Sequence, residues 1–140
     1  MANWSLFSNK QATKSAPSRR EIGNLAETQA CHFLKKKGIH IIERNYCCRG
    51  GELDIIAKEQ ETLIFVEVRM RKNRQYGGAL ISVTPQKQRH LYHAAQCYLQ
   101  QKQLNPARLS IRFDIIAIEH DPEQIQWVKN AFGEPHARAN

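Results

Sequence analysis

GGELDIIAKEQETLIFVEVRMRK, residues 50–72, decides the fold because it contains two apolar segments separated by a polar one. The apolar residues predict strands at 52–57 and 62–70, and the polar residues between them fit a hairpin connection. Residues 63–66 are apolar at every position, which is typical of a central strand buried on both faces. Charged residues nevertheless interrupt both strands, and a charge inside a sheet requires a physical reason.

The interrupting charges are Glu52 and Asp54 on the first strand and Glu67 and Arg69 on the second. Because side chains alternate between the two faces of a strand, each pair shares one face. A hairpin turn centred between residues 59 and 60 would place Glu52 opposite Glu67 and Asp54 diagonal to it, about 7 to 8 Å away. Carboxylates gathered on one patch repel, and partial burial raises their pKa. A divalent cation relieves both effects, and ligands that are all oxygen favour Mg²⁺ or Mn²⁺.

A simpler interpretation is that these acids form edge ion pairs with Arg69 and Arg71. Two observations favour the cation instead. The acids interrupt the most apolar strand of the chain, and they come directly before a long basic segment without acids. A metal ion and a phosphate group that meet at one place would account for this juxtaposition.

The formal charge of +8, from 21 basic and 13 acidic residues, is unevenly distributed along the chain. Residues 68–113 contain no Asp or Glu, and their basic residues are Arg69, Arg71, Lys72, Arg74, Lys87, Arg89, Lys102, Arg108 and Arg112. A solvated face normally mixes charges of both signs, so this segment predicts a polyanionic partner such as nucleic acid. A membrane surface is the weaker alternative, because no strongly amphipathic basic helix with bulky apolar residues is present.

Helices and further strands are predicted on both sides of the hairpin. Apolar residues recur at helical spacing in two segments, and the second begins with Thr84 as N-cap and Pro85 in its first turn. The predicted helices are 21–37 and 84–101, the additional strands are 39–43, 109–119 and 124–128, and 45–51 is a predicted loop.

Neither a signal peptide nor a membrane span is expected. The first twenty residues lack a long apolar segment, and no run approaches the roughly 18 to 20 apolar residues of a span. The four cysteines have no CxxC spacing, which favours reduced thiols in a cytoplasmic protein. We expect one α/β domain at 20–130, a flexible basic tail at 1–19 and a flexible C-terminal tail at 131–140.

The order of the motifs resembles that of a known family. Asp54, followed thirteen residues later by Glu67-Val68-Arg69, resembles the PD-(D/E)XK nuclease signature. A more specific set of motifs is NLAETQACHFLKKKGIHIIERNY, GELDIIA, LIFVEVR, TPQKQRHLYHAAQCYL and RFDIIAI, in this order. The set extends from about residue 20 to residue 119 and resembles the YraN-like family of bacterial proteins, which is related to archaeal Holliday-junction resolvases.

The resemblance implies a restriction endonuclease-like fold, with an αβββαβ core and a central mixed sheet flanked by helices. It also implies hydrolysis of phosphodiester bonds with Mg²⁺ or Mn²⁺. Asp54, Glu67 and the backbone carbonyl of Val68 would bind the cation, and Glu52 is a further candidate ligand. Glu27 matches an acid that resolvases bring into the site, and a solvent-exposed glutamate is the equal alternative.

Arg69 occupies the position at which the superfamily usually has a lysine. Lysine can lose its proton and activate water, whereas arginine cannot act as a base in a protein. Arginine can still bind a phosphate through two hydrogen bonds and stabilise developing negative charge. Catalysis would then require the metal to acidify water, or Glu27 to accept the proton.

Two functional hypotheses follow. The first is a metal-dependent DNA endonuclease that acts on branched or damaged DNA, with Glu27, Asp54, Glu67 and Arg69 as its catalytic residues. The second is a catalytically weak or inactive nuclease-fold module that binds nucleic acid without cutting. Because resolvase-like folds often pair, a homodimer is a candidate assembly.

Two segments supply predicted contacts to nucleic acid. The loop after the second hairpin strand and the start of the second helix together contribute Arg71, Lys72, Arg74, Tyr76, Lys87, Gln88 and Arg89. A tyrosine among arginines can stack on an unpaired base. A solubilising loop is the competing interpretation for each residue.

Three further features remain open at the level of sequence. His90, His93 and Cys97 share a helical face and raise a zinc hypothesis, which the lack of a fourth ligand disfavours. Cys47 and Cys48 are adjacent, which places them poorly for binding one ion together. Asp114 interrupts an apolar strand, where it either supports the site or pairs with a neighbouring arginine.

Overall fold

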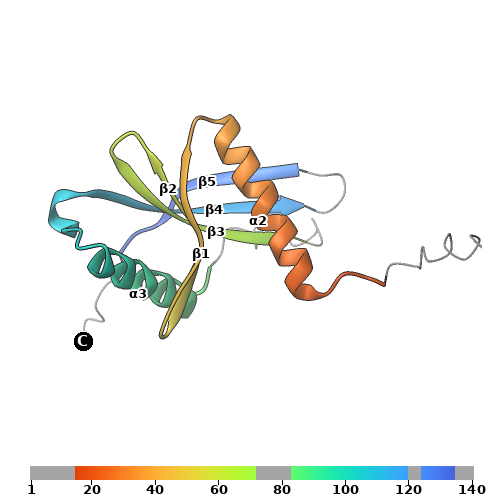
Figure 1. The fold of residues 1–140 in the computed structure, drawn as a ribbon, viewed down its shortest axis with the longest axis horizontal. Helices are drawn as coiled ribbons and strands as arrows, with labels where there is room; N and C mark the ends of the chain where they lie inside the picture. Colours follow the sequence, from red (N-terminus) through yellow and green to blue (C-terminus); the bar gives the residue numbers. More distant parts are fainter. Residues whose placement is uncertain (1–14, 72–82, 120–123, 135–140) are drawn as a thin grey trace, which may run out of the picture.

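The computed structural model describes residues 15–71, 83–119 and 124–134 of the chain. Its elements, in chain order, are α2 (Arg19–Lys36), β1 (His40–Cys48), β2 (Gly51–Glu59), β3 (Thr62–Arg71), α3 (Pro85–Gln101), the short 3-10 helix η2 (Pro106–Arg108), β4 (Ser110–Glu119) and β5 (Gln124–Phe132). The strands form one mixed sheet in the order β1-β2-β3-β4-β5, in which β3 and β4 are parallel and the other pairs antiparallel (Figure 1). The predicted αβββαβ core is confirmed, with β5 added at the edge.

Both helices begin at strong N-caps. Ser18 Oγ accepts a hydrogen bond from the Glu21 backbone N–H at 3.1 Å, and Glu21 Oε1 accepts one from the Ser18 N–H at 2.8 Å. This reciprocal pair is a capping box. At α3, Thr84 Oγ1 accepts from the Lys87 N–H at 3.1 Å and Pro85 occupies the first turn, which confirms the predicted start. Among the described residues, no helix is both long and apolar enough to cross a membrane.

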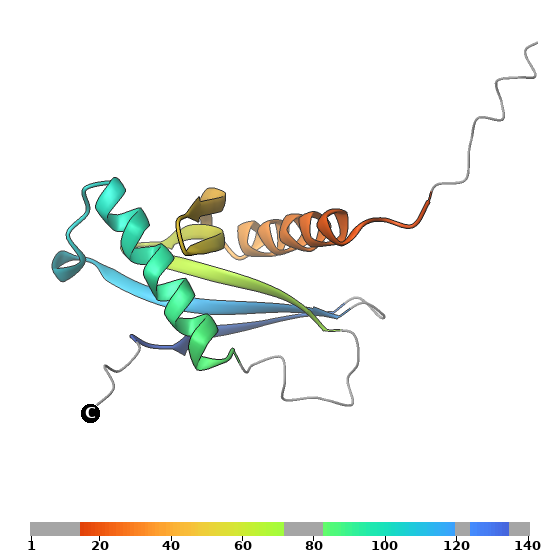
Figure 2. The ribbon, with the colours of Figure 1, turned by 90° about the horizontal axis from the view of Figure 1, so that it is seen from below.

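The two helices cover opposite faces of the sheet, and Figure 2 shows them well apart from one another. Adjacent residues of β3 separate the two layers, since Ile64 belongs to the core cluster with α2 and Phe65 to the cluster with α3. The α2 residues buried in the first cluster are Ala26, Ala30, Cys31 and Leu34. The α3 residues buried in the second are Leu91, Ala94, Ala95, Tyr98 and Leu99. A central strand buried on both faces is therefore confirmed for β3.

β1 is longer than the sequence predicted. The predicted loop at 45–51 is wrong, because the strand continues to Cys48 and pairs with β2 up to Gly51. Asn45 has a φ of 52° and lies where the side chains of β1 change from one face of the sheet to the other. Arg44 contacts α2, whereas Tyr46 packs in the cluster with α3, although residues two apart on a regular strand share a face.

β2 shows the same rotation opposite Asn45. Leu53 is buried in the cluster with α3, and Ile55 is buried in the cluster with α2. Asp54 lies between them, and the regular pairing of β2 with β3 ends at Ile55 and Val66. The change of face thus occurs at the first acid of the nuclease-like signature.

The predicted hairpin register is wrong by two residues. Lys58 pairs with Leu63, so the turn centres between Gln60 and Glu61, and Gln60 takes a positive φ of 54°. Glu52 does not lie opposite Glu67; its partner on the neighbouring strand is Cys47. A shift of two residues keeps every side chain on its face but changes its partner.

Candidate functional site

Asp54 and Glu67 meet where β2 separates from β3. The Val68 backbone N–H donates a 2.9 Å hydrogen bond to Asp54 Oδ2, which fixes this carboxyl group beside the next strand. The two carboxyl groups are close enough to share a proton. The sequence predicted that Asp54 and Glu67 lie close together, as they do, but the register makes Asp54, rather than Glu52, the closer partner of Glu67.

Both acids hold their protons more tightly than free carboxyl groups do. Burial is the largest cause of the raised pKa of Asp54. Burial and the neighbouring Asp54 charge raise the pKa of Glu67 to about 7. These are the effects that a bound cation would oppose, because its positive charge favours the ionised carboxylates.

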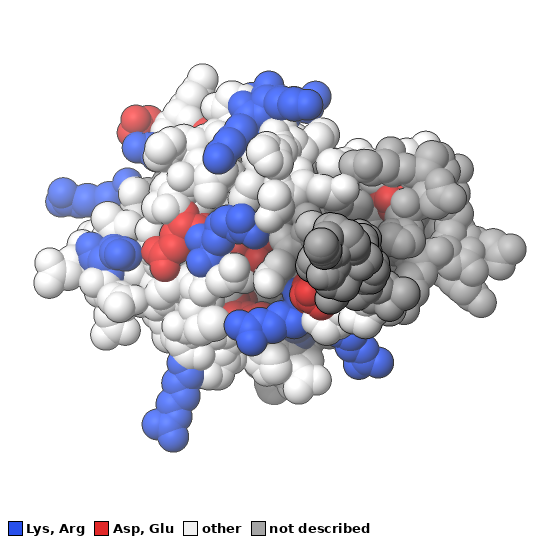
Figure 3. All heavy atoms as spheres, turned by 45° about the vertical axis from the view of Figure 1, so that its right-hand side comes forward, with Lys and Arg blue, Asp and Glu red and all other residues white. Residues whose placement is uncertain are grey.

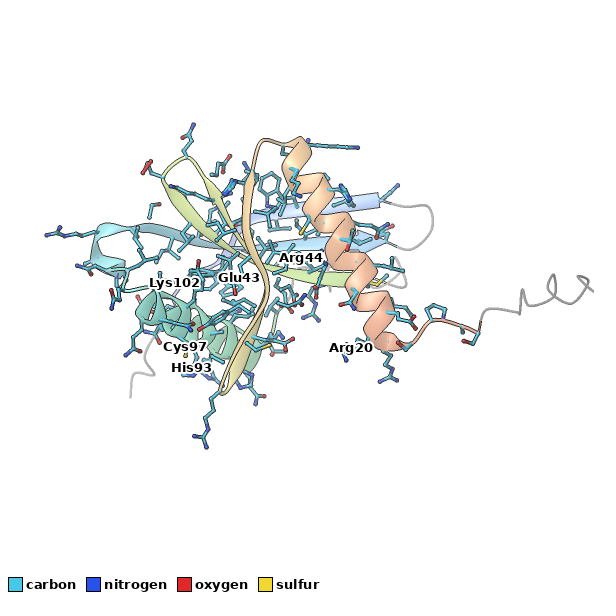
Figure 4. All side chains as sticks on the ribbon, viewed as in Figure 1. Arg20, Glu43, Arg44, His93, Cys97 and Lys102 are labelled. Carbon is cyan, nitrogen blue, oxygen red and sulfur yellow. The ribbon has the colours of Figure 1, made fainter. Side chains whose placement is uncertain are left out.

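Glu27 approaches the acid pair from α2. Its side chain is 12% exposed, so the solvent-exposed alternative is wrong. Burial and the Asp54 charge raise the pKa of Glu27. Its Oε1 atom is buried without a hydrogen-bond partner among the described residues, and Arg44 Nη2 lies 3.7 Å from it. Figure 4 shows Arg44 on β1 beside α2.

Two basic side chains lie next to Glu67. Lys87 Nζ is 3.5 Å from Glu67 Oε2, and Arg69 Nη1 is 3.7 Å from the same oxygen. Lys87 comes from the first turn of α3, whereas Arg69 follows two residues later on β3. The sequence assigned Lys87 to phosphate binding only, and it missed that the packing of α3 brings this amine to the acid pair.

The other predicted residues lie further out or outside the described residues. Glu52 is exposed, and Cys47 Sγ is 3.9 Å from its Oε2 atom. Gln88 Nε2 donates to the Val83 carbonyl at 2.9 Å, and Arg89 is exposed. Residues not described, in side chain or altogether, are Arg71, Lys72, Arg74 and Tyr76.

Asp114 does not belong to this site. It is fully buried and accepts hydrogen bonds from the Arg112 guanidinium, from Trp127 Nε1 and from the Asn130 backbone N–H, each at 2.9 Å at the closest atom. It pairs with Val66, which packs with α2, whereas Glu67 faces the other side of β3. Of the two sequence interpretations, pairing with the neighbouring arginine is therefore the one that the structure shows.

The basic segment 68–113 does not form an unbroken basic surface where it is described. Lys87 and Arg69 approach Glu67, while Arg112 contacts both Asp114 and Glu59. On the face drawn in Figure 3, acidic atoms lie between the Lys and Arg side chains. The described basic groups are thus partly balanced by the acids of the candidate site.

The residues present fit a divalent cation that prefers oxygen. Asp54 and Glu67 offer carboxylate oxygens at one place, and the buried Glu27 Oε1 lacks a hydrogen-bond donor. In the part of the chain that the structure describes, no choice of one oxygen from each of these three acids places all three oxygens within 4.8 Å of one another. Asp54 and Glu67 therefore form the core of the candidate site, and Glu27 lies at its side.

The sequence of the chain matches one family of known proteins. Residues 26–118 match the Uncharacterised protein family UPF0102. A UPF0102 protein of Herminiimonas arsenicoxydans is 45% identical over 114 residues, which cover 81% of this chain and 88% of the relative. UPF0102 proteins of Alcanivorax borkumensis and Aeromonas hydrophila are each 46% identical over 118 residues, covering 82% and 84% of this chain and 94% and 87% of the relatives.

The chain belongs to the UPF0102 family. This confirms the resemblance to YraN-like proteins that the ordered motifs indicated. The UPF0102 match begins one residue before Glu27 and includes Asp54, Glu67 and Lys87. All the side chains that meet at the candidate site thus lie within the segment shared with the family.

Proposed function

We propose that this UPF0102 protein is a metal-dependent endonuclease that hydrolyses DNA phosphodiester bonds, at branched or damaged DNA. The observation that carries the proposal is an acid pair, the half-buried Asp54 and the buried Glu67, with a lysine and an arginine directly beside it. Acids that hold a cation and basic groups that hold a phosphate are the two requirements of metal-assisted phosphodiester hydrolysis.

Asp54 and Glu67 would hold Mg²⁺ or Mn²⁺, with the Val68 carbonyl as an additional ligand. The bound cation would supply an acidified water molecule and charge stabilisation for the phosphate. The Val68 N–H keeps Asp54 in place through its 2.9 Å hydrogen bond. Glu27 is half-buried, and its Oε1 atom has no hydrogen-bond partner among the described residues. This side chain is in position to accept a proton from a water molecule at the site.

Lys87 can supply the amine that is missing at the position of Arg69. A lysine is absent from its usual place on β3, but Lys87 Nζ reaches Glu67 from α3 at 3.5 Å. We assign to Lys87 the role of the missing amine, which orients water or neutralises the phosphate. Arg69, which is 38% exposed in its side chain, then serves as the outer phosphate contact.

One observation favours a second candidate, a module that binds nucleic acid without cutting. Lys87 and Arg69 already offset the charge of Glu67, so the acid pair has cationic neighbours without a metal. Such a module would show affinity for DNA that falls with salt, in the absence of any cleavage.

The first experiment is a cleavage assay on labelled linear, flapped and four-way DNA, with EDTA, Mg²⁺ or Mn²⁺. Asp54→Asn should abolish cleavage, and Glu61→Gln, which changes an exposed acid in the hairpin turn, is the matched control. Salt-sensitive binding without cutting under every metal would establish the binding module instead.

A second set of variants tests the role of Lys87. Lys87→Ala should lower the cleavage rate by about 100-fold, as loss of a charge-stabilising or proton-transferring group does. Lys58→Ala, at an exposed position of β2, is the control. If Lys87→Ala cleaves at the wild-type rate while Asp54→Asn does not, the site stands but the assignment of Lys87 is wrong.

A further inference from the structure

A second group of ligand-type side chains lies away from the acid pair, at the tip of the β1–β2 hairpin. Cys48, His93 and Cys97 each bring one ligand atom within 4.8 Å of the other two. Among the described residues, this is the one group of three metal-ligating side chains with such spacing. Figure 4 shows His93 and Cys97 on α3.

The distance between the two ligand atoms on α3 matches that of a metal centre. Two ligands held tetrahedrally by Zn²⁺, at about 2.3 Å for sulfur and about 2.1 Å for nitrogen, lie about 3.6 Å apart. Cys97 Sγ and His93 Nε2 are 3.5 Å apart. His93 and Cys97 are separated by one helical turn, and this spacing presents both side chains on the same face of α3.

Close packing of the hairpin against α3 holds Cys48 in place. A Cβ atom on Gly51 would lie 2.7 Å from the His90 carbonyl oxygen and 3.2 Å from Ala94 Cβ, so this position requires glycine. A Cβ atom on Gly50 would contact the His93 ring at 3.4 Å. The tip of the hairpin therefore lies directly on the turn of α3 that carries His93.

The remaining cysteines do not join this group. Cys47, next to Cys48 in sequence, lies close to Glu52 and to the Asn45 carbonyl. Cys31 is buried under α2, in the cluster on the opposite face of the sheet. The selection of Cys48 over the other two thiols thus follows from the fold.

We propose that Cys48, His93 and Cys97 form a binding site for a soft divalent cation of the Zn²⁺ type. Two thiolates and one imidazole are the ligands that zinc prefers, and they distinguish this site from the oxygen-only acid pair. The fourth ligand is an oxygen, from water or from the Arg49 carbonyl, which lies 3.0 Å from His93 Nε2. His93 is exposed and the two cysteines are half-buried, so the ion can enter from solvent.

Binding exchanges protons for the metal. Each of the two thiols releases its proton to solvent as its sulfur bonds to the cation. His93 binds through Nε2 as a neutral ring, with its proton on Nδ1, and gives up any hydrogen bond from Nε2 to the Arg49 carbonyl. The oxidation states of metal and sulfur stay unchanged.

The site would add a bond to metal between two elements that packing and a hydrogen bond from Tyr46 Oη to Gln101 Oε1, at 2.9 Å, already hold together. Cys48 ends β1, and three residues after Gly51 the chain reaches Asp54. His93 and Cys97 lie on α3, the helix whose first turn carries Lys87. A metal at this place therefore fixes the acid-bearing strand relative to the lysine-bearing helix.

The test is a titration of the reduced, metal-free protein with Co²⁺ alone, followed by displacement with Zn²⁺. We expect one thiolate-bound Co²⁺ per chain, recognised by the absorption of thiolate-to-cobalt charge transfer and of tetrahedral coordination. Cys48→Ser and Cys97→Ser should each lower the affinity on the order of 100-fold or more. Cys47→Ser is the matched control and should bind as the wild type does, and so should Asp54→Asn, which excludes the acid pair.

The thermal unfolding midpoint provides a second readout that does not depend on colour. Zn²⁺ should raise it in the wild type and in Cys47→Ser but not in Cys48→Ser, because a ligand that binds the folded state stabilises it. A six-coordinate cobalt spectrum without thiolate bands would overturn the proposal. Equal loss of affinity in Cys47→Ser and Cys48→Ser would do so too. If the reduced protein binds no cobalt and the oxidised protein links Cys48 to Cys97, the pair is a disulfide and the proposal is wrong.

Discussion

Asp114 and Glu67 are buried acids on neighbouring strands, but their surroundings differ in kind. Asp114, 0% exposed, accepts hydrogen bonds from Arg112, Trp127 and the Asn130 backbone at 2.9 to 3.2 Å. Glu67, 7% exposed, has cations no closer than 3.5 Å in the described residues and lies against another acid. Burial alone therefore does not distinguish the two acids. Asp114 is surrounded by hydrogen-bond donors, whereas Glu67 lies between another acid and two basic side chains.

The largest expected difference between the two acids is in the free energy of unfolding of their alanine variants. Asp114→Ala should lower the free energy of unfolding by about 3 to 5 kcal/mol, because Trp127 and Asn130 lose their acceptor and the Arg112 charge loses a partner. Glu67→Ala should change it by less than about 1 kcal/mol, since Lys87 and Arg69 can both reach water. Urea unfolding of both variants measures the difference, and equal destabilisation would contradict the comparison.

The next effect concerns pH. The folded protein holds the Glu67 proton up to about pH 7, whereas the unfolded chain releases it near the ordinary glutamate value of 4.5. Folding therefore favours the protonated form, and the metal-free wild type should lose stability as pH rises from about 4.5 to about 7, by at most about 3 kcal/mol. Glu67→Gln should reduce this slope, and the part that remains comes from Asp54 and Glu27, because burial raises the pKa of both. The free energy of unfolding of both proteins, measured from about pH 5 to about pH 8, tests this. A wild type that gains stability relative to the variant over that range would contradict it.

The arginines beside the two acids should respond differently to replacement by lysine. Arg112 contacts both oxygens of Asp114 and also Glu59, so Arg112→Lys should cost about 1 to 2 kcal/mol of stability. Arg69 makes one long contact, at 3.7 Å to Glu67, and Arg69→Lys should cost less than about 0.5 kcal/mol. Chemical unfolding under identical conditions compares the two. A costly Arg69→Lys would mean that Glu67 is held as firmly as Asp114.

The last prediction tests one hydrogen bond to Asp114. Trp127→Phe removes the indole N–H, which donates to Asp114 Oδ2 at 2.9 Å, but keeps an aromatic ring against Phe33. The expected loss is about 1 to 2 kcal/mol, the value of a hydrogen bond to a charged group together with a little packing. Combination with Asp114→Ala should give less than the sum of the two losses, because the partner is already gone. Full additivity in this double-mutant cycle would show that the bond contributes nothing.

Periodicity and capping residues predicted the order of elements, but not the pairing between strands. Thr84 and Pro85 marked the start of α3, and the apolar run of β3 marked the central strand. The segment KEQE has no glycine or Asn-Gly pair, so nothing in it indicated that Gln60 and Glu61 form the turn. Asp54 and Glu67 still lie together because the error was an even number of residues.

The parts of the two sites that the sequence missed come from tertiary contacts. Lys87 reaches Glu67 only because the first turn of α3 packs over β3. Cys48 joins His93 and Cys97 only because Gly51 allows the hairpin to approach α3. The helical spacing of His93 and Cys97 was visible in the sequence. Cys48, the third residue of the group, lies 45 residues away from His93 along the chain.

The parallel pairing of β3 with β4 determines when the protein becomes complete as it leaves the ribosome. Residues 15–71 form α2 and an antiparallel meander, whose contacts are close in sequence and hence fast to form. β3 cannot acquire its parallel neighbour until α3 and β4 have been synthesised, so its edge stays open to other chains until then. The emerging polypeptide thus contains Glu27, Asp54 and Glu67 before Lys87, whose charge offsets that of Glu67, has been synthesised. Premature termination would leave a fragment with an unpaired strand edge, and we expect such a fragment to aggregate or to be degraded by proteases.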